Sequence, residues 1–350
     1  MMDKKTLFFI GLSIVILMAM LYFVGIDRII SILKTADLYL IALAVLIQIF
    51  TYFLYTLRWK ILNDVSHIKV SFKNLFPIMM VGLAVNNITP AGRGGGEPVR
   101  AYILAKQHNY PMKDTFAAVV ADKLLDTFPF VVLAAITIFS MIMYFNVSFT
   151  LIVLMVAAII AIIALLIVFI YMCVNVKFGM RVEGWIVGLI RKIKKNDSES
   201  LENKVHGFIL GFQDNMKLLM SSNKVLYCTI ALSFLIWFFE ILRVYVVFSA
   251  FGLTLNFAVI AEVFIVASLV GMIPILPGGL GAVDSLMAVL YSKAGIAISL
   301  TAPITLIERL ISFWMATIIG LILIPHYGAS VLDKLSVSSS VEDLEKSGDE

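Results

Sequence analysis

The sequence has 350 residues, of which 61% are hydrophobic and only 14% are charged, and its formal net charge is +4. Soluble domains contain about 45–50% apolar and about 25% charged residues. The composition, with a mean hydropathy of +1.01, therefore excludes a soluble protein and predicts an all-α, polytopic integral membrane protein. The small net charge, concentrated in loops that flank apolar segments, argues against a nucleic-acid binder.

Six apolar segments are long enough to cross a bilayer, which takes about 20 apolar residues per helix. In chain order they are 6–26, 37–57, 114–145, 148–173, 225–251 and 298–325. We expect the first to be an uncleaved anchor, because it is too long for a signal peptide and no small-x-small cleavage site follows it.

Two further apolar segments, 74–88 and 257–275, each run into a stretch rich in proline and glycine. The first continues as NITPAGRGGGEPVR (87–100) and the second as PILPGGLGAVD (274–284). Irregular backbone at membrane depth is tolerated only where it is buried in protein or lines a wet cavity. Both segments are therefore predicted to be re-entrant or broken helical hairpins.

Positive charges predict the orientation of the chain. The loop 174–224 carries nine Lys and Arg residues, whereas 146–147 and 252–256 carry none. If segment 74–88 dips in and returns, the four positive charges between residues 58 and 73 stay on the same side as the loop 174–224. This predicts a multi-pass cell-membrane protein with both termini in the cytoplasm.

We expect a single membrane domain over 1–328 with a cytoplasmic loop at 174–224, followed by a disordered acidic cytoplasmic tail at 329–350. Within the loop, residues 201–219 have apolar side chains at helical spacing. This pattern predicts an amphipathic helix, either on the inner membrane surface or docked on the bundle.

An internal repeat relates about 37–145 to about 225–325. Glycine, proline and charged residues recur at a nearly constant offset. The pairs that are 187 positions apart are Pro90–Pro277, Gly92–Gly279, Gly94–Gly281 and Glu97–Asp284. The offset is 186 for Asp122–Glu308 and Lys123–Arg309, and 185 for Arg58–Arg243. With the hairpins re-entrant, the two copies are predicted to be inverted. Inverted repeats with interrupted helices are typical of transporters, which bind substrate near the midplane.

Charged residues inside apolar helices are costly, so they normally face a cavity or a partner. The expected cavity charges are Arg58, Asp122, Lys123, Asp126, Arg243, Glu308 and Arg309. Glu240 and Glu262 lie in neighbouring helices, and a local pair with Arg243 is the better interpretation of Glu240. Buried ion pairs that only fix the packing of the two repeats are the alternative.

The glycine-rich loops are candidates for binding a lipid phosphate, since glycine lets backbone amides approach a ligand and a helix amino terminus favours anions. The candidate residues are Arg93, Gly94, Gly95, Gly96, Glu97, Arg100, Gly278, Gly279, Gly281 and Asp284. Close helix packing is the competing reason for the glycines. No Gly-Lys-Ser/Thr follows, so the first loop is not a Walker loop.

The sequence holds no pattern typical of a catalytic, cofactor or metal site. There is no Gly-x-Ser-x-Gly, and the four histidines and two cysteines do not have metal-ligand spacing. We therefore expect neither an enzyme nor a cofactor, although Asp122 and Asp126 have the spacing of an acid/base pair.

The stretch 87–100 with Asp122-Lys123, and the stretch 276–284 with Glu308-Arg309, resemble the flippase-like membrane domain of lysylphosphatidylglycerol synthases. The likeness covers about residues 5–328. Asp284 departs from the glutamate expected in many relatives but keeps the charge. In the synthases a soluble domain that transfers lysine to the lipid follows. We expect no such domain in this protein, so the resemblance implies lipid movement and not aminoacylation.

The resemblance implies binding and translocation of an anionic lipid or a polyprenyl-phosphate-linked glycolipid. Two alternatives remain open: an ion-coupled small-molecule transporter, and a non-transporting partner of an envelope glycosyltransferase. A homo-oligomer is also compatible with the sequence.

Overall fold

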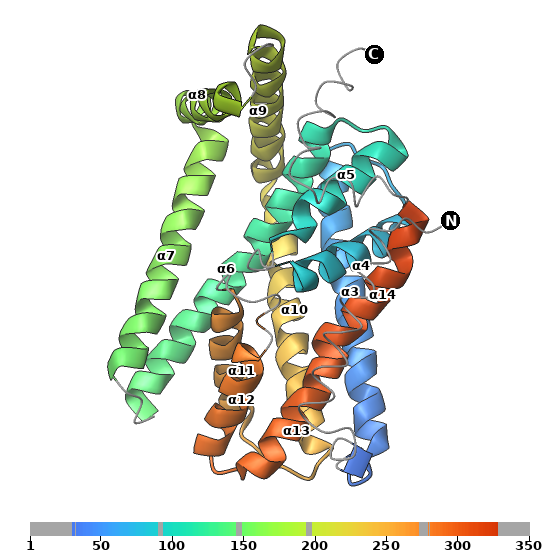
Figure 1. The fold of residues 1–350 in the computed structure, drawn as a ribbon, viewed down its shortest axis with the longest axis vertical. Coiled ribbons are helices and arrows are strands. Elements are labelled where there is room, and N and C mark those ends of the chain that lie inside the picture. Colours follow the sequence, from blue (N-terminus) through green and yellow to red (C-terminus); the bar gives the residue numbers. More distant parts are fainter. Residues whose placement is uncertain are drawn as a thin grey trace.

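The computed structural model describes residues 30–31, 33–89, 94–144, 149–193, 198–272, 279 and 281–327. These residues are helical, with no strand among them (Figure 1). Five helical segments of the described residues are long and apolar enough to cross a membrane: Leu38–Val65, Met112–Met143, Ile152–Cys173, Asn223–Ser249 and Ile298–Tyr327. They match five of the six predicted spans. The sixth, 6–26, and the tail 329–350 lie outside the described residues, as do Arg93 and Gly278.

The helix α3 (Leu38–Val65) is longer than the predicted span 37–57. The span is predicted to end before Arg58 because a charged residue normally marks the end of an apolar membrane segment. The helix continues because Trp59 and Leu62 are buried, while Lys60 and Asp64 form an exposed ion pair one turn apart. Arg58 consequently lies inside the helix, with its side chain fully enclosed by protein.

Both predicted hairpins are broken helices. The helix α4 (Phe72–Ile88) is followed by α5 (Gly96–His108), and α11 (Phe257–Gly271) is followed by α12 (Ala282–Lys293). In Figure 1 the first hairpin occupies the end of the molecule that carries α9, and the second occupies the opposite end. The two hairpins thus enter from opposite sides, as the inverted repeat predicts.

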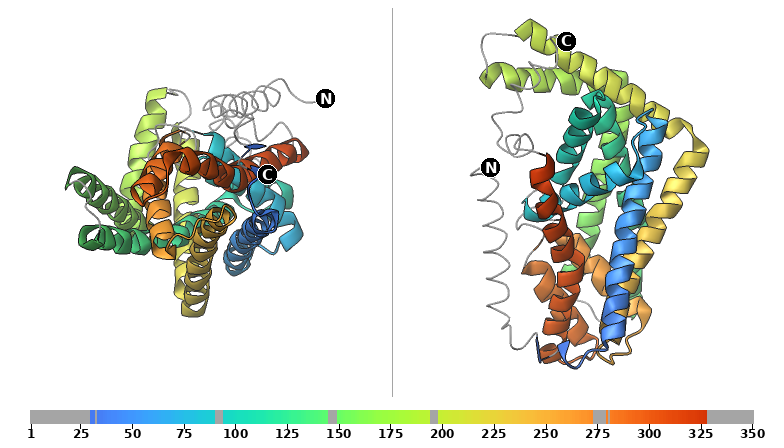
Figure 2. Two further views of the ribbon diagram at one scale, coloured as in Figure 1. Left: turned by 90° about the horizontal axis from the view of Figure 1, so that it is seen from below. Right: turned by 90° about the vertical axis from the view of Figure 1, so that its right-hand side faces the viewer.

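The loop 174–224 contains two helices, α8 (Val176–Ile193) and α9 (Ser198–Ser221). Both lie over one end of the molecule (Figures 1 and 2). Val205, Phe212, Met216 and Leu219 of α9 are buried, and this side of α9 packs on α6 (Met112–Tyr144). Of the two predicted placements, docking on the bundle is therefore confirmed. The sequence did not predict α8.

The helix pair α3 and α10 (Asn223–Ser249) makes the most extensive contact between helices of the described chain. Leu38 and Asn223, where the two helices begin, are 185 positions apart, the same offset as Arg58 and Arg243. The helices α6 and α13 (Ile298–Arg309) begin 186 positions apart. The repeat thus extends from single residues to whole helices, while α7 (Phe149–Val174) joins the two copies through α8 and α9.

The last span is not a continuous α-helix. The helix α13 passes through the π-helix η2 (Leu310–Trp314) into α14 (Met315–Leu323) and the short 3₁₀ turn η3 (Ile324–Tyr327). The π-helix begins directly after Glu308 and Arg309. Such turns occur mostly as single insertions in α-helices and often lie at functional sites.

Gly320 of α14 lets this helix lie directly against α4. A Cβ atom at position 320 would lie 2.3 Å from the Met80 carbonyl oxygen and 2.4 Å from the Ala84 Cβ. Gly320→Ala should therefore destabilise the protein by about 1–3 kcal/mol through overpacking, measured as a lower melting temperature in detergent. Gly207→Ala is the control, because a Cβ there meets nothing within 4 Å. An unchanged melting temperature for Gly320→Ala would contradict this packing.

The predicted orientation can be measured by cysteine labelling in intact cells. Lys69 and Thr254 are exposed and lie in loops at opposite ends of α3 and α10. With Cys228 replaced by Ser, Lys69→Cys should react only after the membrane is permeabilised, and Thr254→Cys should react with an impermeant reagent from outside. The reverse pattern would place the α8–α9 end outside.

Candidate functional site

Each half of the chain encloses one arginine between carboxylates. Arg58 of α3 pairs with Asp122 at 2.7 Å and with Asp126 at 3.0 Å, both from α6. The Arg58 and Asp122 side chains are only 1% and 4% exposed. A buried charge without a partner is strongly unfavourable, so these three residues depend on one another.

The second half repeats this arrangement at equivalent positions. Arg243 of α10 pairs with Glu308 of α13 at 2.6 Å, and both side chains are at most 2% exposed. Arg243 also pairs with Glu240 of its own helix. The local pair expected from the sequence is confirmed, but Glu240 is in addition part of the larger cluster.

The hairpins contribute a second equivalent set of ion pairs. Lys123 lies 3.2 Å from Glu97 at the start of α5, and Arg309 lies 2.9 Å from Asp284 at the start of α12. The correspondence inferred from the offsets of 186 and 187 positions is thereby confirmed by contacts. Glu97 and Asp284 were predicted among the phosphate-binding residues; in the structure their carboxylates are the partners of cations.

Arg100 is also part of this network. Its guanidinium lies 3.1 Å from Asp122, contacts the Met79 sulfur at 3.0 Å and lies over the Trp59 ring at 5.0 Å. The Arg100 side chain runs past Gly82, where a Cβ would come within 2.4 Å of the arginine chain. Gly82 is thus required for this position of Arg100.

The two arginines make a reciprocal contact across α3 and α10. Arg58 of α3 donates to the Ser233 hydroxyl of α10 at 2.9 Å, and Arg243 of α10 donates to the Gln48 side-chain oxygen of α3. Gln48 and Ser233 are 185 positions apart, as are the two arginines. Sequence reasoning missed both polar residues, although the shared offset was a signal that could have found them.

Two backbone amides of the glycine-rich stretches donate hydrogen bonds to side chains of the protein itself. The Gly96 N–H donates to the Asn86 side chain at 2.6 Å, and the Gly281 N–H donates to the Asp284 carboxylate at 2.8 Å. Gly279 and Gly281 have φ of +69° and +80°, which other residues rarely adopt. Gly94 is exposed, and Gly95 leaves no room for a side chain because Thr89 lies within 2.2 Å of the Cβ position. Phosphate binding by these loops stays a prediction.

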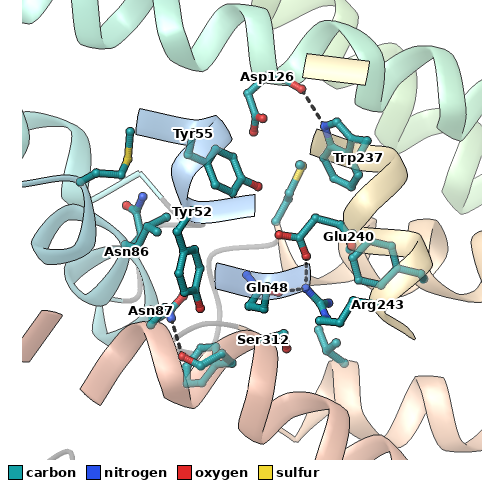
Figure 3. Close-up of a pocket in the computed structure, with 18 of the residues that line it drawn as sticks. Gln48, Tyr52, Tyr55, Asn86, Asn87, Asp126, Trp237, Glu240, Arg243 and Ser312 are labelled. Carbon is teal, nitrogen blue, oxygen red and sulfur yellow. Dashed lines mark hydrogen bonds and ion pairs between the residues drawn. The ribbon is translucent and has the colours of Figure 1, made fainter. Parts of the chain in front are cut away.

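A cavity of about 260 Å³ lies between the two halves. Figure 3 shows Tyr52, Tyr55, Asn86, Trp237, Glu240 and Arg243 around it. All seven predicted cavity charges line it, together with two of the hairpin residues. These nine are Arg58, Glu97, Arg100, Asp122, Lys123, Asp126, Arg243, Glu308 and Arg309. The aromatic rings of the lining were not predicted.

Among the described residues, no cluster of three or more His, Cys, Asp or Glu side chains has the arrangement of a metal site. Glu262, the other membrane-embedded carboxylate considered above, is outside the cavity lining and accepts a hydrogen bond from Ser140 of α6. The arrangement suits the reversible binding of a polar group by charges and hydrogen bonds.

Comparison with known families supports a membrane function. Residues 7–320 match the family described as the lysylphosphatidylglycerol synthase TM region. The chain belongs to this family. The match spans the two hairpins and every ion pair of the cavity.

Three similar proteins, all membrane proteins by name, align with this chain over most of both lengths. A UPF0104 membrane protein of Methanothermobacter thermautotrophicus is 43% identical over 334 residues, which covers 95% of this chain and 99% of the relative. UPF0104 membrane proteins of Pyrococcus horikoshii and Methanocaldococcus jannaschii are each 30% identical, covering 92% and 91% of this chain and 97% and 94% of theirs. The family resemblance expected from the two loop motifs is confirmed over nearly the whole chain.

Proposed function

We propose that this protein binds the polar headgroup of a phosphate-containing lipid, or of a polyprenyl-phosphate glycolipid, and moves it between the leaflets of the cell membrane. The observation that carries the proposal is the cavity between the two halves of the chain, lined by ten charged residues within an apolar helical bundle. Charged side chains inside a membrane are energetically unfavourable unless they face a polar pathway or pair with another group.

Movement of a headgroup needs polar contacts that can be exchanged one for another. Each arginine and lysine that lines the cavity lies within 3.2 Å of a carboxylate. A headgroup that enters would replace one partner of a pair at a time, so no bare charge faces the hydrocarbon. The acyl chains would remain in the surrounding lipid, against the apolar outer faces of the spanning helices.

Lys123 is the cation best placed to meet a phosphate. Its side chain is 39% exposed, whereas the Arg58 and Arg243 side chains are 1% exposed. A partly exposed ammonium can approach the lipid phosphate without first leaving a buried site. Glu97, its partner, belongs to the hairpin, so entry of a phosphate would loosen the contact between α5 and α6.

The proposal is tested with purified protein in proteoliposomes. Fluorescent phosphatidylglycerol and a short-chain glycolipid analogue are each placed in both leaflets, and a membrane-impermeant quencher is added outside. Vesicles with protein should lose nearly all fluorescence, whereas protein-free vesicles should lose about half. If both lipids behave as in protein-free vesicles, with the protein folded and inserted, the proposal is wrong.

A further inference from the structure

The helix α8 follows the membrane span α7 after a single residue, Asn175, and runs across its end. Figures 1 and 2 show α7 along the length of the molecule and α8 crosswise to it. Because α7 is long and apolar enough to cross the membrane, a helix set across its end lies along the membrane surface. The position of α8 is thus the boundary between the acyl chains and the headgroups.

The corner between α7 and α8 is fixed by hydrogen bonds and close contacts. The Asn175 side chain accepts a hydrogen bond from the Phe178 N–H at 3.1 Å and so caps the start of α8. Gln213 of α9, which is 1% exposed, donates to the carbonyl oxygens of Met172 at 2.5 Å and Asn175 at 3.3 Å. A Cβ atom at Gly179 would lie 2.2 Å from the Gln213 side chain, so α8 passes directly against α9. The direction of α8 is therefore a defined feature of the fold.

An aromatic face of α8 is turned toward the lipid-facing surface of α7. Trp185 is 68% exposed, and Phe178 lies two turns before it on the same face of the helix. The Phe178 ring contacts the ring of Tyr171, which is 52% exposed on α7, with 5.2 Å between the ring centres. Tryptophan and tyrosine are enriched at the membrane interface, because their rings are partly apolar and partly polar. Trp185 is therefore placed to enter this layer.

Two exposed cations, Lys177 and Arg181, lie one turn apart beside this aromatic face. No carboxylate of the described chain pairs with either of them. Positions 191 and 192 of the same helix also hold Arg and Lys, and α8 contains a single acidic residue, Glu183. The helix thus combines an excess of positive charge with an apolar face at the membrane surface, which is typical of helices that bind anionic lipid.

We propose that α8 binds anionic phospholipid headgroups of the leaflet that meets the end of α7. Trp185 would enter the boundary of the acyl chains, while Lys177 and Arg181 would reach the phosphates, since long cationic side chains can extend along apolar surface to a polar layer. A lipid occupant is favoured over a soluble one because the aromatic face continues the lipid-facing surface of α7. The surface is separate from the cavity lining and does not depend on the proposed movement of lipid.

The binding is tested by the fluorescence of Trp185 in nanodiscs of phosphatidylcholine. The other three tryptophans of the chain, Trp59, Trp237 and Trp314, are at most 5% exposed, and the wild type minus Trp185→Phe gives the emission of Trp185. A fixed fraction of the lipid is replaced by phosphatidylglycerol or by phosphatidylcholine, each brominated on its acyl chains near the headgroup. Brominated phosphatidylglycerol should quench Trp185 about twofold more strongly, and the difference should shrink as salt is added.

The variant Lys177→Gln with Arg181→Gln should be quenched equally by the two lipids, because α8 keeps its apolar face but loses the two cations. Lys177→Arg with Arg181→Lys keeps both charges and should retain the preference for phosphatidylglycerol. Lys69→Gln with Lys73→Gln is the matched control, since it removes two exposed cations that lie outside α8. It should quench as the wild type does.

Three results would overturn the proposal. The first is a wild type in which neither brominated lipid quenches Trp185, and the second is equal quenching by the two lipids. The third is a preference for phosphatidylglycerol that survives in Lys177→Gln with Arg181→Gln. If lipid does not quench Trp185 but its protection from acrylamide rises with protein concentration, a second copy of the chain covers this face instead.

Discussion

Asp122→Asn and Glu308→Gln will each reduce lipid movement by the reconstituted protein to the rate of protein-free vesicles. The two carboxylates occupy equivalent positions and each holds a buried arginine at the cavity wall, at 2.7 Å and 2.6 Å. Without either carboxylate the exchange of ion pairs along the proposed path is interrupted. The quencher assay measures this loss directly.

Asp64→Asn is the control for this experiment, because Asp64 pairs with Lys60 on the surface and its side chain is 47% exposed. It should move lipid at the wild-type rate. Each variant must also elute as a single species in detergent, so that loss of movement is not loss of fold. Two well-folded cavity variants with wild-type rates would show that these carboxylates do not belong to the path.

Arg58→Met will be the most destabilising single replacement in the first half. It leaves Asp122 with only the Arg100 guanidinium and removes the arginine that pairs with Asp126, in a site where the Asp122 side chain is 4% exposed. Removing one partner of a buried ion pair costs about 3–5 kcal/mol. The expected result is a large fall in melting temperature and in the amount of protein that inserts into the membrane.

A second replacement should restore much of this loss. In Arg58→Met with Asp126→Asn, the remaining carboxylate, Asp122, keeps the Arg100 guanidinium at 3.1 Å, so the double variant should be more stable than Arg58→Met alone. Lys60→Met changes a neighbouring cation in a solvent-exposed pair, which is worth about 0–1 kcal/mol. Equal losses for Arg58→Met and Lys60→Met would mean that burial of the Arg58 cluster does not contribute to stability.

The sequence predicted the plan of the molecule because its rare residues are informative. In an apolar chain, a charge, proline or glycine has few reasons to recur, and the recurrence of Asp122-Lys123 as Glu308-Arg309 indicated the two halves. The offsets identified equivalent residues, but they could not show which cation contacts which carboxylate. Those contacts depend on how the hairpins meet the spanning helices, which is a property of the tertiary structure.

Two features lay beyond the sequence for physical reasons. The helix α8 mixes charged and apolar residues in a segment that had been interpreted only as a positive loop. The predicted end of α3 at residue 57 is wrong. A charged residue in an apolar segment resembles the end of a membrane helix when its buried partner in α6 is unknown.

The reciprocal contact between α3 and α10 has a consequence for how this chain can change over generations. A substitution at Gln48 alters the surroundings of Arg243, and one at Ser233 alters those of Arg58. Each half therefore supplies part of the environment on which the other half's charge depends. A substitution in one repeat must therefore be compensated by a substitution in the other, so we expect the two repeats to co-evolve.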